Sequence, residues 1–293
     1  MRRVLLVVAV VVTLTTSLVA CGDDGKPDKT IAILRAVAVA PETQKALLGV
    51  LADAGWKEGD NLTVLDPDVT EAHADPDDAA AAVRGWVKKG VDMIIALSTP
   101  AAMAAMKAAP KTPILTLAND PVGSGLLKDP DEPEGNLTGV AFRTPPDRTI
   151  DVATRIADDI TTIGVLAPAD DPAGEPVRKG LDEAARSLSV KVVDAAFHDS
   201  SDVGTAVDAL ASGGAQVVVL VNSAATVRVY DALGAALSAA KLPAVANIVS
   251  NPFALVILAP DQPAAYRQLG RQAVRLLNDT SVSKVPIEEP GEF

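Results

Sequence analysis

The side chains that could carry chemistry in this chain suit ligand binding better than catalysis. Both histidines, His73 and His198, stand in acidic, polar surroundings without the helix-spaced partners of a zinc site, which predicts exposed loop residues. The sequence contains no nucleophile-elbow motif, no phosphate-binding glycine loop and no dinucleotide fingerprint. We therefore expect no catalytic residue, no metal site and no cofactor, and the prediction is a protein that is not an enzyme.

Small polar residues stand directly before two predicted helices. Ser98 and Thr99 come before Pro100, which is a favoured first residue of a helix. Asn222 and Ser223 precede the helical pattern that begins at the next residue. Free backbone N–H groups at a helix N-terminus attract carboxylates, so these four residues are predicted to contact a ligand carboxylate. Plain helix capping is the alternative, and capping does not exclude contact with a ligand.

Asp120 and Phe142 complete the predicted ligand site. Asp120 could pair with an ammonium group, and a role as the turn residue of an Asp-Pro turn is the alternative. Phe142 could stack on a flat ligand or belong to the core. Aromatic residues make up only 3% of the chain, which excludes a rich aromatic cage. Gly123 and Gly125 are predicted to serve hinge or turn geometry.

These residues lie in a chain that alternates strand-like and helical patterns throughout. Predicted strands cover residues 31–34, 61–65, 91–97, 114–117, 161–166, 190–193, 216–221, 244–246 and 255–258. Predicted helices cover residues 41–54, 77–89, 100–108, 175–187, 202–211, 224–240 and 263–278. An irregular stretch rich in Pro, Gly and Asp, residues 118–146, separates two such units.

Apolar strands that alternate with helices of this length form parallel sheets with right-handed crossovers. The predicted fold is therefore α/β, with two doubly wound parallel-sheet lobes joined by a multi-strand hinge. We expect residues 30–118 and 255–280 to form lobe 1. Residues 119–254 and 281–293 are expected to form lobe 2 and the hinge crossovers. Ligands of parallel sheets lie at the carboxyl ends of the strands, so two facing lobes would form a closing cleft.

The N-terminus has the features of a bacterial secretory leader. Two arginines precede a short apolar run, and Leu-Val-Ala stands directly before Cys21, the only cysteine in the chain. This arrangement resembles a lipobox. It predicts a signal peptide over residues 1–20, lipidation of Cys21 and a polar tether over residues 21–29. A single transmembrane anchor is the alternative, but the apolar run is short and interrupted by Thr and Ser. The protein is therefore expected to lie outside the cytoplasm, anchored to the membrane.

Composition restricts the possible partners. The formal charge is −12, and removal of Arg2 and Arg3 with the leader would make it −14. Such an acidic chain is a poor match for nucleic acid or for anionic lipid head groups. Hydrophobic residues make up 48% of the 293 residues, which is ample for the cores of two domains. We expect a monomer that binds a small molecule.

Several segments together resemble the substrate-binding lipoproteins of ABC transporters, a family with tryptophan- and tyrosine-binding members. The segments are Ala96–Ala102, Asn119–Leu126, Gly135–Val140, Ile163–Leu166 and Leu269–Gln272, within roughly residues 30–290. The pair DPVGSGL and GNLTGV at this spacing is the most specific part. The resemblance implies a type I periplasmic-binding fold, hinge closure on a small ligand and delivery to a membrane permease. Members usually continue beyond the segment that ends here at Phe293, so lobe 2 is expected to lack its last elements.

Three classes of function remain open at this point. The favoured one is a lipid-anchored solute-binding protein that captures an amino acid or related carboxylate by lobe closure and delivers it to an ABC permease. The second is a ligand-sensing lipoprotein that presents a signal to a membrane receptor. An extracytoplasmic α/β enzyme ranks lowest, because no nucleophile–base pair or metal set is visible in the sequence.

Overall fold

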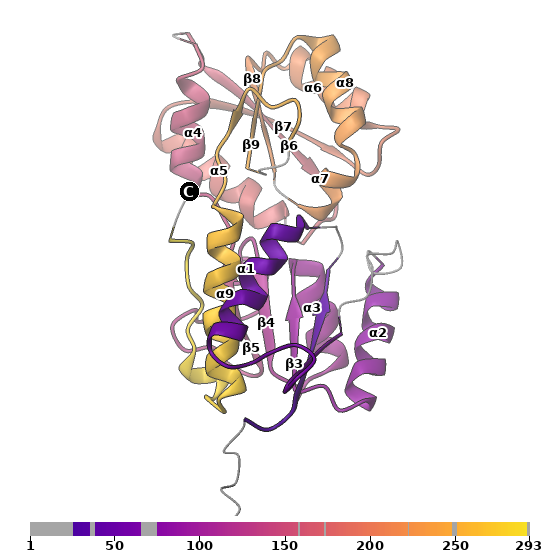
Figure 1. The fold of residues 1–293 in the computed structure, drawn as a ribbon. Helices are drawn as coiled ribbons and strands as arrows, with labels where there is room; N and C mark the ends of the chain where they lie inside the picture. Colours follow the sequence, from indigo (N-terminus) through magenta and orange to yellow (C-terminus); the bar gives the residue numbers. More distant parts are fainter. Residues whose placement is uncertain are drawn as a thin grey trace, which may run out of the picture.

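The chain forms two lobes that are stacked end to end (Figure 1). The computed structural model describes residues 26–35, 39–65, 75–157, 159–172, 174–221, 223–247 and 251–291. Each lobe contains a five-stranded parallel sheet with helices on both faces. The predicted fold class, α/β with two parallel-sheet lobes, is confirmed. The predicted signal peptide, residues 1–20, and Cys21 lie outside the described residues.

Lobe 1 is built on the sheet order β2-β1-β3-β4-β5. Its strands are β1 (Lys29–Leu34), β2 (Leu62–Leu65), β3 (Met93–Ala96), β4 (Ile114–Ala118) and β5 (Leu137–Ala141). The helices α1 (Pro41–Asp53) and α9 (Gln262–Leu277) cover one face, and α2 (Pro76–Lys88) and α3 (Thr99–Ala108) cover the other. Every residue of β3, β4 and β5 is buried, because helices cover both faces of the sheet.

Lobe 2 follows the sheet order β10-β9-β8-β6-β7. Its strands are β6 (Thr162–Pro168), β7 (Lys191–Phe197), β8 (Val217–Leu220), β9 (Ala244–Ala246) and β10 (Val256–Ile257). One face carries α4 (Pro146–Thr154) and α5 (Gly174–Ser187), and the other carries α6 (Val203–Ser212) and α8 (Tyr230–Ala240). The short helix α7 (Ala224–Arg228) follows β8 and breaks the single predicted helix at Val229.

The lobe boundaries differ from the predicted ones in three segments. We expected residues 119–254 to form lobe 2 and the hinge crossovers, but β5 pairs with β4 and so belongs to the sheet of lobe 1. Residues 281–291 also return to lobe 1, where the short helix η2 (Val282–Lys284) and Glu288 lie beside β5. Residues 255–258 were expected in lobe 1, but β10 pairs with β9 of lobe 2. Strand pairing decides these assignments, and pairing is not visible in local sequence patterns.

The last residues of the predicted tether, residues 26–29, dock on lobe 1. Strand β1 begins at Lys29. The Lys26 ammonium group donates a 2.8 Å hydrogen bond to the carbonyl of Ala54 and lies 4.4 Å from the ring centre of Trp56. Among the described residues, no helix is long and apolar enough to span a membrane.

Candidate functional site

A cleft of about 370 Å³ lies between the two lobes. Lobe 1 contributes the N-terminal turn of α2 and one side of α3 from Pro100 to Lys107, and these helices follow β2 and β3. Lobe 2 contributes the loop after β6, the residue after β7, and α7, which follows β8. All of these segments follow the carboxyl ends of strands, where parallel sheets bind their ligands. The cleft is therefore placed where the topology predicts a ligand site.

The N-terminus of α3 forms part of the lobe 1 wall. Ser98 has an extended backbone, and its hydroxyl accepts a 3.2 Å hydrogen bond from the N–H of Ala101, so it is the predicted helix cap. The neighbouring Thr99 is only 1% exposed. Its hydroxyl has no hydrogen-bond partner within the described part of the chain. A buried hydroxyl without a partner costs free energy.

The lobe 2 side of the cleft is organised differently. Ser223 is buried and caps α7 by accepting a 3.2 Å hydrogen bond from the N–H of Thr226. The Thr226 hydroxyl in turn donates to the carbonyl of Val221. The predicted contact Asn222 lies outside the described residues. Ser223 thus serves as a cap in this structure, and its contact with a ligand stays a prediction.

Asp120 lies in a second interlobe cavity of about 750 Å³, which α3 does not line. Its carboxylate accepts a 2.8 Å hydrogen bond from the N–H of Gly123 and lies 3.9 Å from the guanidinium group of Arg143. Arg143 also forms a 2.9 Å ion pair with Glu289, and this hydrogen-bonded pair raises the pKa of Arg143. Asp120 therefore lines a different cavity from the 370 Å³ cleft, which Pro100 and Ala224 line and Ser98, Thr99 and Ser223 do not. The pairing of Asp120 with an ammonium group stays a prediction.

Phe142 belongs to the hydrophobic cluster of lobe 1 that also contains Val140 and Tyr266. The side chain is 8% exposed, and the backbone N–H donates a 2.7 Å hydrogen bond to the carbonyl of Ala118. This is the core position that was the alternative to ligand stacking. Stacking of Phe142 on a ligand remains a prediction.

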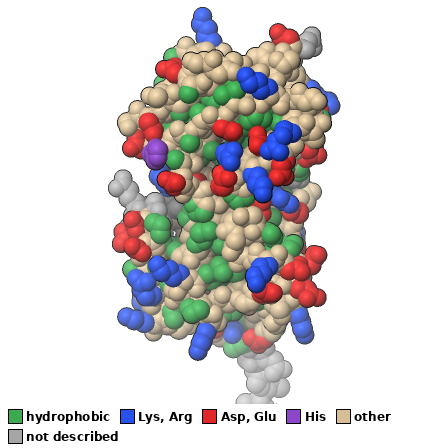
Figure 2. All heavy atoms as spheres, turned by 180° about the vertical axis from the view of Figure 1, so that it is seen from behind, with side chains coloured by type: hydrophobic (Ala, Val, Ile, Leu, Met, Phe, Trp, Pro, Cys, Tyr) green, Lys and Arg blue, Asp and Glu red, His purple; other side chains and the backbone are tan. Residues whose placement is uncertain are grey.

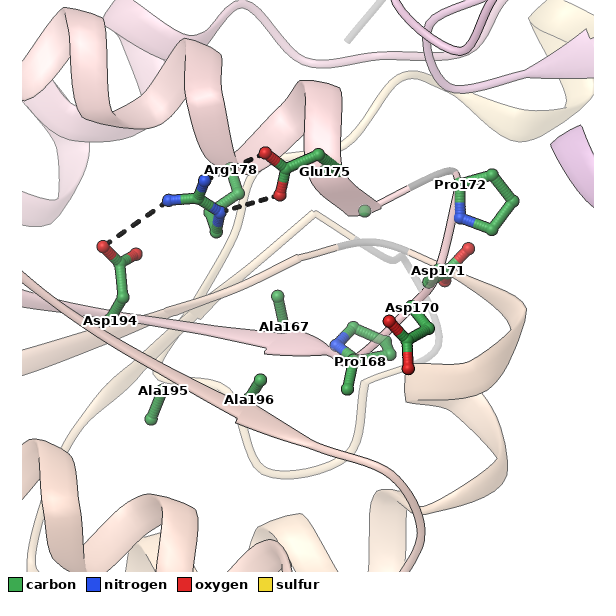
Figure 3. A pocket seen from close by; sticks show the side chains of 12 residues that line it. Ala167, Pro168, Asp170, Asp171, Pro172, Glu175, Arg178, Asp194, Ala195 and Ala196 are labelled. Carbon is green, nitrogen blue, oxygen red and sulfur yellow. Dashed lines mark hydrogen bonds and ion pairs between the residues drawn. The ribbon is translucent and has the colours of Figure 1, made fainter.

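A third cavity, of about 670 Å³, lies on lobe 2 and holds a charged network that the sequence analysis missed (Figure 3). Arg178 forms two 3.0 Å hydrogen bonds with Glu175, one turn earlier on α5, and lies 3.6 Å from Asp194 on β7. The hydrogen bond from Arg178 lowers the pKa of Glu175, whereas burial raises the pKa of Asp194. The i,i+3 spacing of Glu175 and Arg178 was a usable signal, but nothing local points to Asp194.

The matching family model covers residues 31–290 and describes ABC transporter substrate-binding proteins. The chain belongs to this family. The tyrosine-binding protein of Clostridioides difficile (strain R20291) is 27% identical to this substrate-binding protein over 270 residues, which are 90% of this chain and 77% of the relative.

Solved structures show the same fold. One is a domain in complex with L-Trp from Streptococcus pneumoniae, with a TM-score of 0.79, 20% identity and 89% of each chain covered. Another is the ligand-free, open structure of a substrate-binding protein with adhesive properties from Clostridium difficile, with a TM-score of 0.69, 25% identity and 90% of each chain covered. The fold implied by the resemblance, that of type I periplasmic-binding proteins, is thereby confirmed.

The described histidine of this substrate-binding protein pairs with a neighbouring carboxylate. The side chain of His198 is 71% exposed, as predicted, and its Nδ1 lies 3.0 Å from a carboxylate oxygen of Asp202. That hydrogen bond raises the pKa of His198. His73 lies outside the described residues. Within the described ranges, no group of three or more His, Cys, Asp or Glu side chains could hold a metal ion.

Proposed function

We propose that this substrate-binding protein captures an amino acid or a related carboxylate between its lobes and delivers it to an ABC permease. Membership of the family supports the role in transport. The relatives support the class of ligand, since one is named for tyrosine and another was solved with L-Trp. The proposed ligand contacts are the residues predicted from the sequence, which are Ser98, Thr99, Asp120, Phe142, Asn222 and Ser223.

The unpartnered hydroxyl of Thr99 is the observation that carries this proposal. It stands at the first residue of α3, beside the cap Ser98, where the helix also presents free backbone N–H groups. Backbone N–H groups and a hydroxyl together supply the donors that a carboxylate accepts. A bound carboxylate would satisfy the Thr99 hydroxyl that no described residue satisfies.

The test compares two threonines of lobe 1. Thr99→Val removes the unpartnered hydroxyl at nearly constant shape, so we expect stability that is unchanged or higher and about tenfold weaker amino-acid binding, the loss of one hydrogen bond. The matched control is Thr116→Val. The Thr116 hydroxyl donates a 3.1 Å hydrogen bond to the buried carbonyl of Ala96, so its loss should cost about 1 kcal/mol of unfolding free energy and leave affinity unchanged.

Titration calorimetry of the wild-type protein against the twenty amino acids identifies the ligand for this comparison. If Thr99→Val binds the ligand with the same affinity as the wild type, Thr99 does not contact the ligand. No heat with any amino acid, from a protein that unfolds cooperatively, would refute the proposed ligand class.

We further propose that the protein is an extracytoplasmic lipoprotein anchored through Cys21. A lipobox-like sequence supports the anchor, and the role of the family in import supports the location. In cell fractionation, the wild-type protein should sediment with membranes, whereas Cys21→Ser should abolish acylation and change its mobility on a denaturing gel. A palmitate analogue supplied to the cells should label the wild type and not Cys21→Ser. Equal labelling of the two would contradict lipidation at Cys21.

A further inference from the structure

A turn of lobe 1, residues 120–125, touches lobe 2 at Gly123. A Cβ atom added at Gly123 would lie 2.7 Å from the Cβ of Pro176, whereas ordinary van der Waals contact begins at 3.4 Å. Pro176 lies in the first turn of α5, so this contact joins the two lobes. No side chain larger than hydrogen fits at residue 123 while the lobes keep this arrangement.

The backbone at this position does not itself require glycine. Gly125, two residues later, has a φ of +73° and occupies the left-handed region that favours glycine. Gly123 is absent from the residues with positive φ, so an alanine could adopt its backbone conformation. The glycine at residue 123 is therefore explained by two close neighbours, Asp120 in the same turn and Pro176 of lobe 2, and the glycine at residue 125 by the shape of the turn.

The turn is fixed to the hinge, so it cannot easily move aside. The Asp120 carboxylate accepts the N–H of Gly123 and faces Arg143, which lies on the crossover from β5 to α4. The Ser124 hydroxyl donates to the carbonyl of Asp120. Arg143 is bound in turn to Glu289 of the C-terminal segment. Figure 2 shows Lys, Arg, Asp and Glu side chains gathered across the middle of the back face of the molecule.

We propose that Gly123 sets how closely the two lobes can approach, and thereby sets the affinity for the ligand. This inference rests on the proposed function for its effect on binding, but its effect on lobe separation does not depend on any ligand. The contact between Gly123 and Pro176 lies close to the hinge. A small volume added there rotates the lobes apart and so produces a larger separation at the far end of the cleft, an effect that we call the wedge. When only the closed state binds the ligand, the apparent affinity of the protein falls in proportion to the fraction of molecules that are closed.

The experiment measures lobe separation and binding independently. Spin labels on Lys88→Cys in lobe 1 and Asp208→Cys in lobe 2, in the full chain carrying Cys21→Ser, report the distance between two exposed helix positions. Gly123→Ala should lengthen this distance in the ligand-free protein. It should also weaken the binding of L-tyrosine or L-tryptophan, whichever the wild type binds, by tenfold or more.

Compensating and control variants separate the wedge from local damage to the turn. Pro176→Gly removes the Cβ atom that the new methyl group at residue 123 would strike, so the double variant should regain the wild-type distance. The added Cβ would also lie 2.5 Å from a carboxylate oxygen of Asp120. Asp120→Ala alone should therefore keep the wild-type distance, and Gly123→Ala in that background should still lengthen it. Ser124→Ala, in the same turn, removes a hydrogen bond of the turn without adding volume, so it should leave the label distance unchanged.

Two results would overturn the inference. The first is an unchanged label distance in Gly123→Ala, and the second is a longer distance that Pro176→Gly does not reverse. If the wild type binds no amino acid but the distances change as expected, the wedge stands and the proposed ligand class fails.

Discussion

Lobe 1 and lobe 2 have the same sheet-and-helix architecture but differ in how fully it is covered. In lobe 1, three of the five strands are wholly buried, and both polar and apolar residues there are tightly held. In lobe 2, the edge strand β7 alternates exposed and partly buried residues. Near the opposite edge, Leu255 is 63% exposed and Ile257 is 40% exposed.

The polar groups around the cavities of the two lobes also differ. In lobe 1, Thr99, with its unpartnered hydroxyl, directly precedes Pro100, which lines the interlobe cleft. Lobe 2 has the partly exposed ion pair of Arg178 with Glu175 in a different cavity, and its described residues also include buried polar atoms without a partner, Asn247 Oδ1 and Asn251 Nδ2. From the burial of the strands, we expect lobe 1 to be the more rigid half of the molecule and lobe 2 the more adaptable half.

The largest expected effect comes from a matched pair of strand glycines. Gly139 in β5 has a φ of +149°, and a Cβ there would lie 2.0 Å from the backbone oxygen of Thr116. Gly139→Ala should therefore lower the unfolding free energy by about 3–5 kcal/mol or prevent folding. Gly164 in β6 of lobe 2 would place its Cβ 3.2 Å from side-chain atoms of Ala215 and Leu210. Gly164→Ala should cost only about 1 kcal/mol.

Denaturant unfolding checks this pair with a lobe-specific signal. Both tryptophans of the chain, Trp56 and Trp86, lie in lobe 1, so their fluorescence follows that lobe, while far-ultraviolet circular dichroism follows both. Equal losses from the two substitutions would show that the lobes do not differ in rigidity.

A smaller effect is expected from the charged network of lobe 2. Arg178→Met leaves the partly buried Asp194 without its cation and should cost about 1 kcal/mol at neutral pH, since the pair is partly exposed. Burial holds the pKa of Asp194 above its ordinary value of 3.8. An aspartate with a raised pKa destabilises the folded state as pH rises through that pKa. The loss of stability in Arg178→Met, relative to the wild type, should therefore become smaller toward pH 4.

Arg186→Met is the control for this network. Arg186 pairs with Asp182 at 2.6 Å on the solvent face of α5, where its side chain is 66% exposed. Thermal unfolding across pH 4–8 should show no measurable difference between this variant and the wild type. If the loss of stability in Arg178→Met stays constant over the same pH range, lost packing and not lost charge pairing is responsible.

The smallest effect concerns His198 on the loop after β7. Its hydrogen bond to Asp202 raises the pKa of His198 above the ordinary 6.5. The stabilisation is therefore fully present below pH 6.5 and is lost as pH rises through the raised value. Proton NMR titration should show a lower pKa for His198 in Asp202→Asn. An unchanged pKa in that variant would contradict the contact.

Much of the fold was predictable because local patterns carry it. The strand predicted at residues 114–117 is found at 114–118, and the helix predicted at 263–278 is found at 262–277. Ser98 caps its helix as predicted. Continuous apolar runs and capping residues act within a few positions of one another, so the sequence alone reveals them.

Elements that depend on distant partners were missed. Strand β5 contains Gly139 within a Pro- and Gly-rich stretch, which suppresses a strand prediction, yet that glycine is what allows β5 to approach Thr116 on β4. Placing β5 in lobe 2 then misassigned the lobe boundary. The pairing of Arg178 with Asp194 likewise joins residues on different elements, and no local spacing indicates it.

The return of α9 to lobe 1 has a consequence for the order of folding. Lobe 2 is one continuous stretch of chain from α4 to β10, so it can fold as soon as that stretch is complete. The core of lobe 1 instead needs α9 to pack on α1, at a sequence separation of roughly two hundred residues, and it needs residues 281–291 beside β5. The contact between α1 and α9 closes a long loop, which has an entropic cost. It can form only once the C-terminal part has emerged from the ribosome or the export channel. The half of the molecule synthesised first is therefore the half that is completed last.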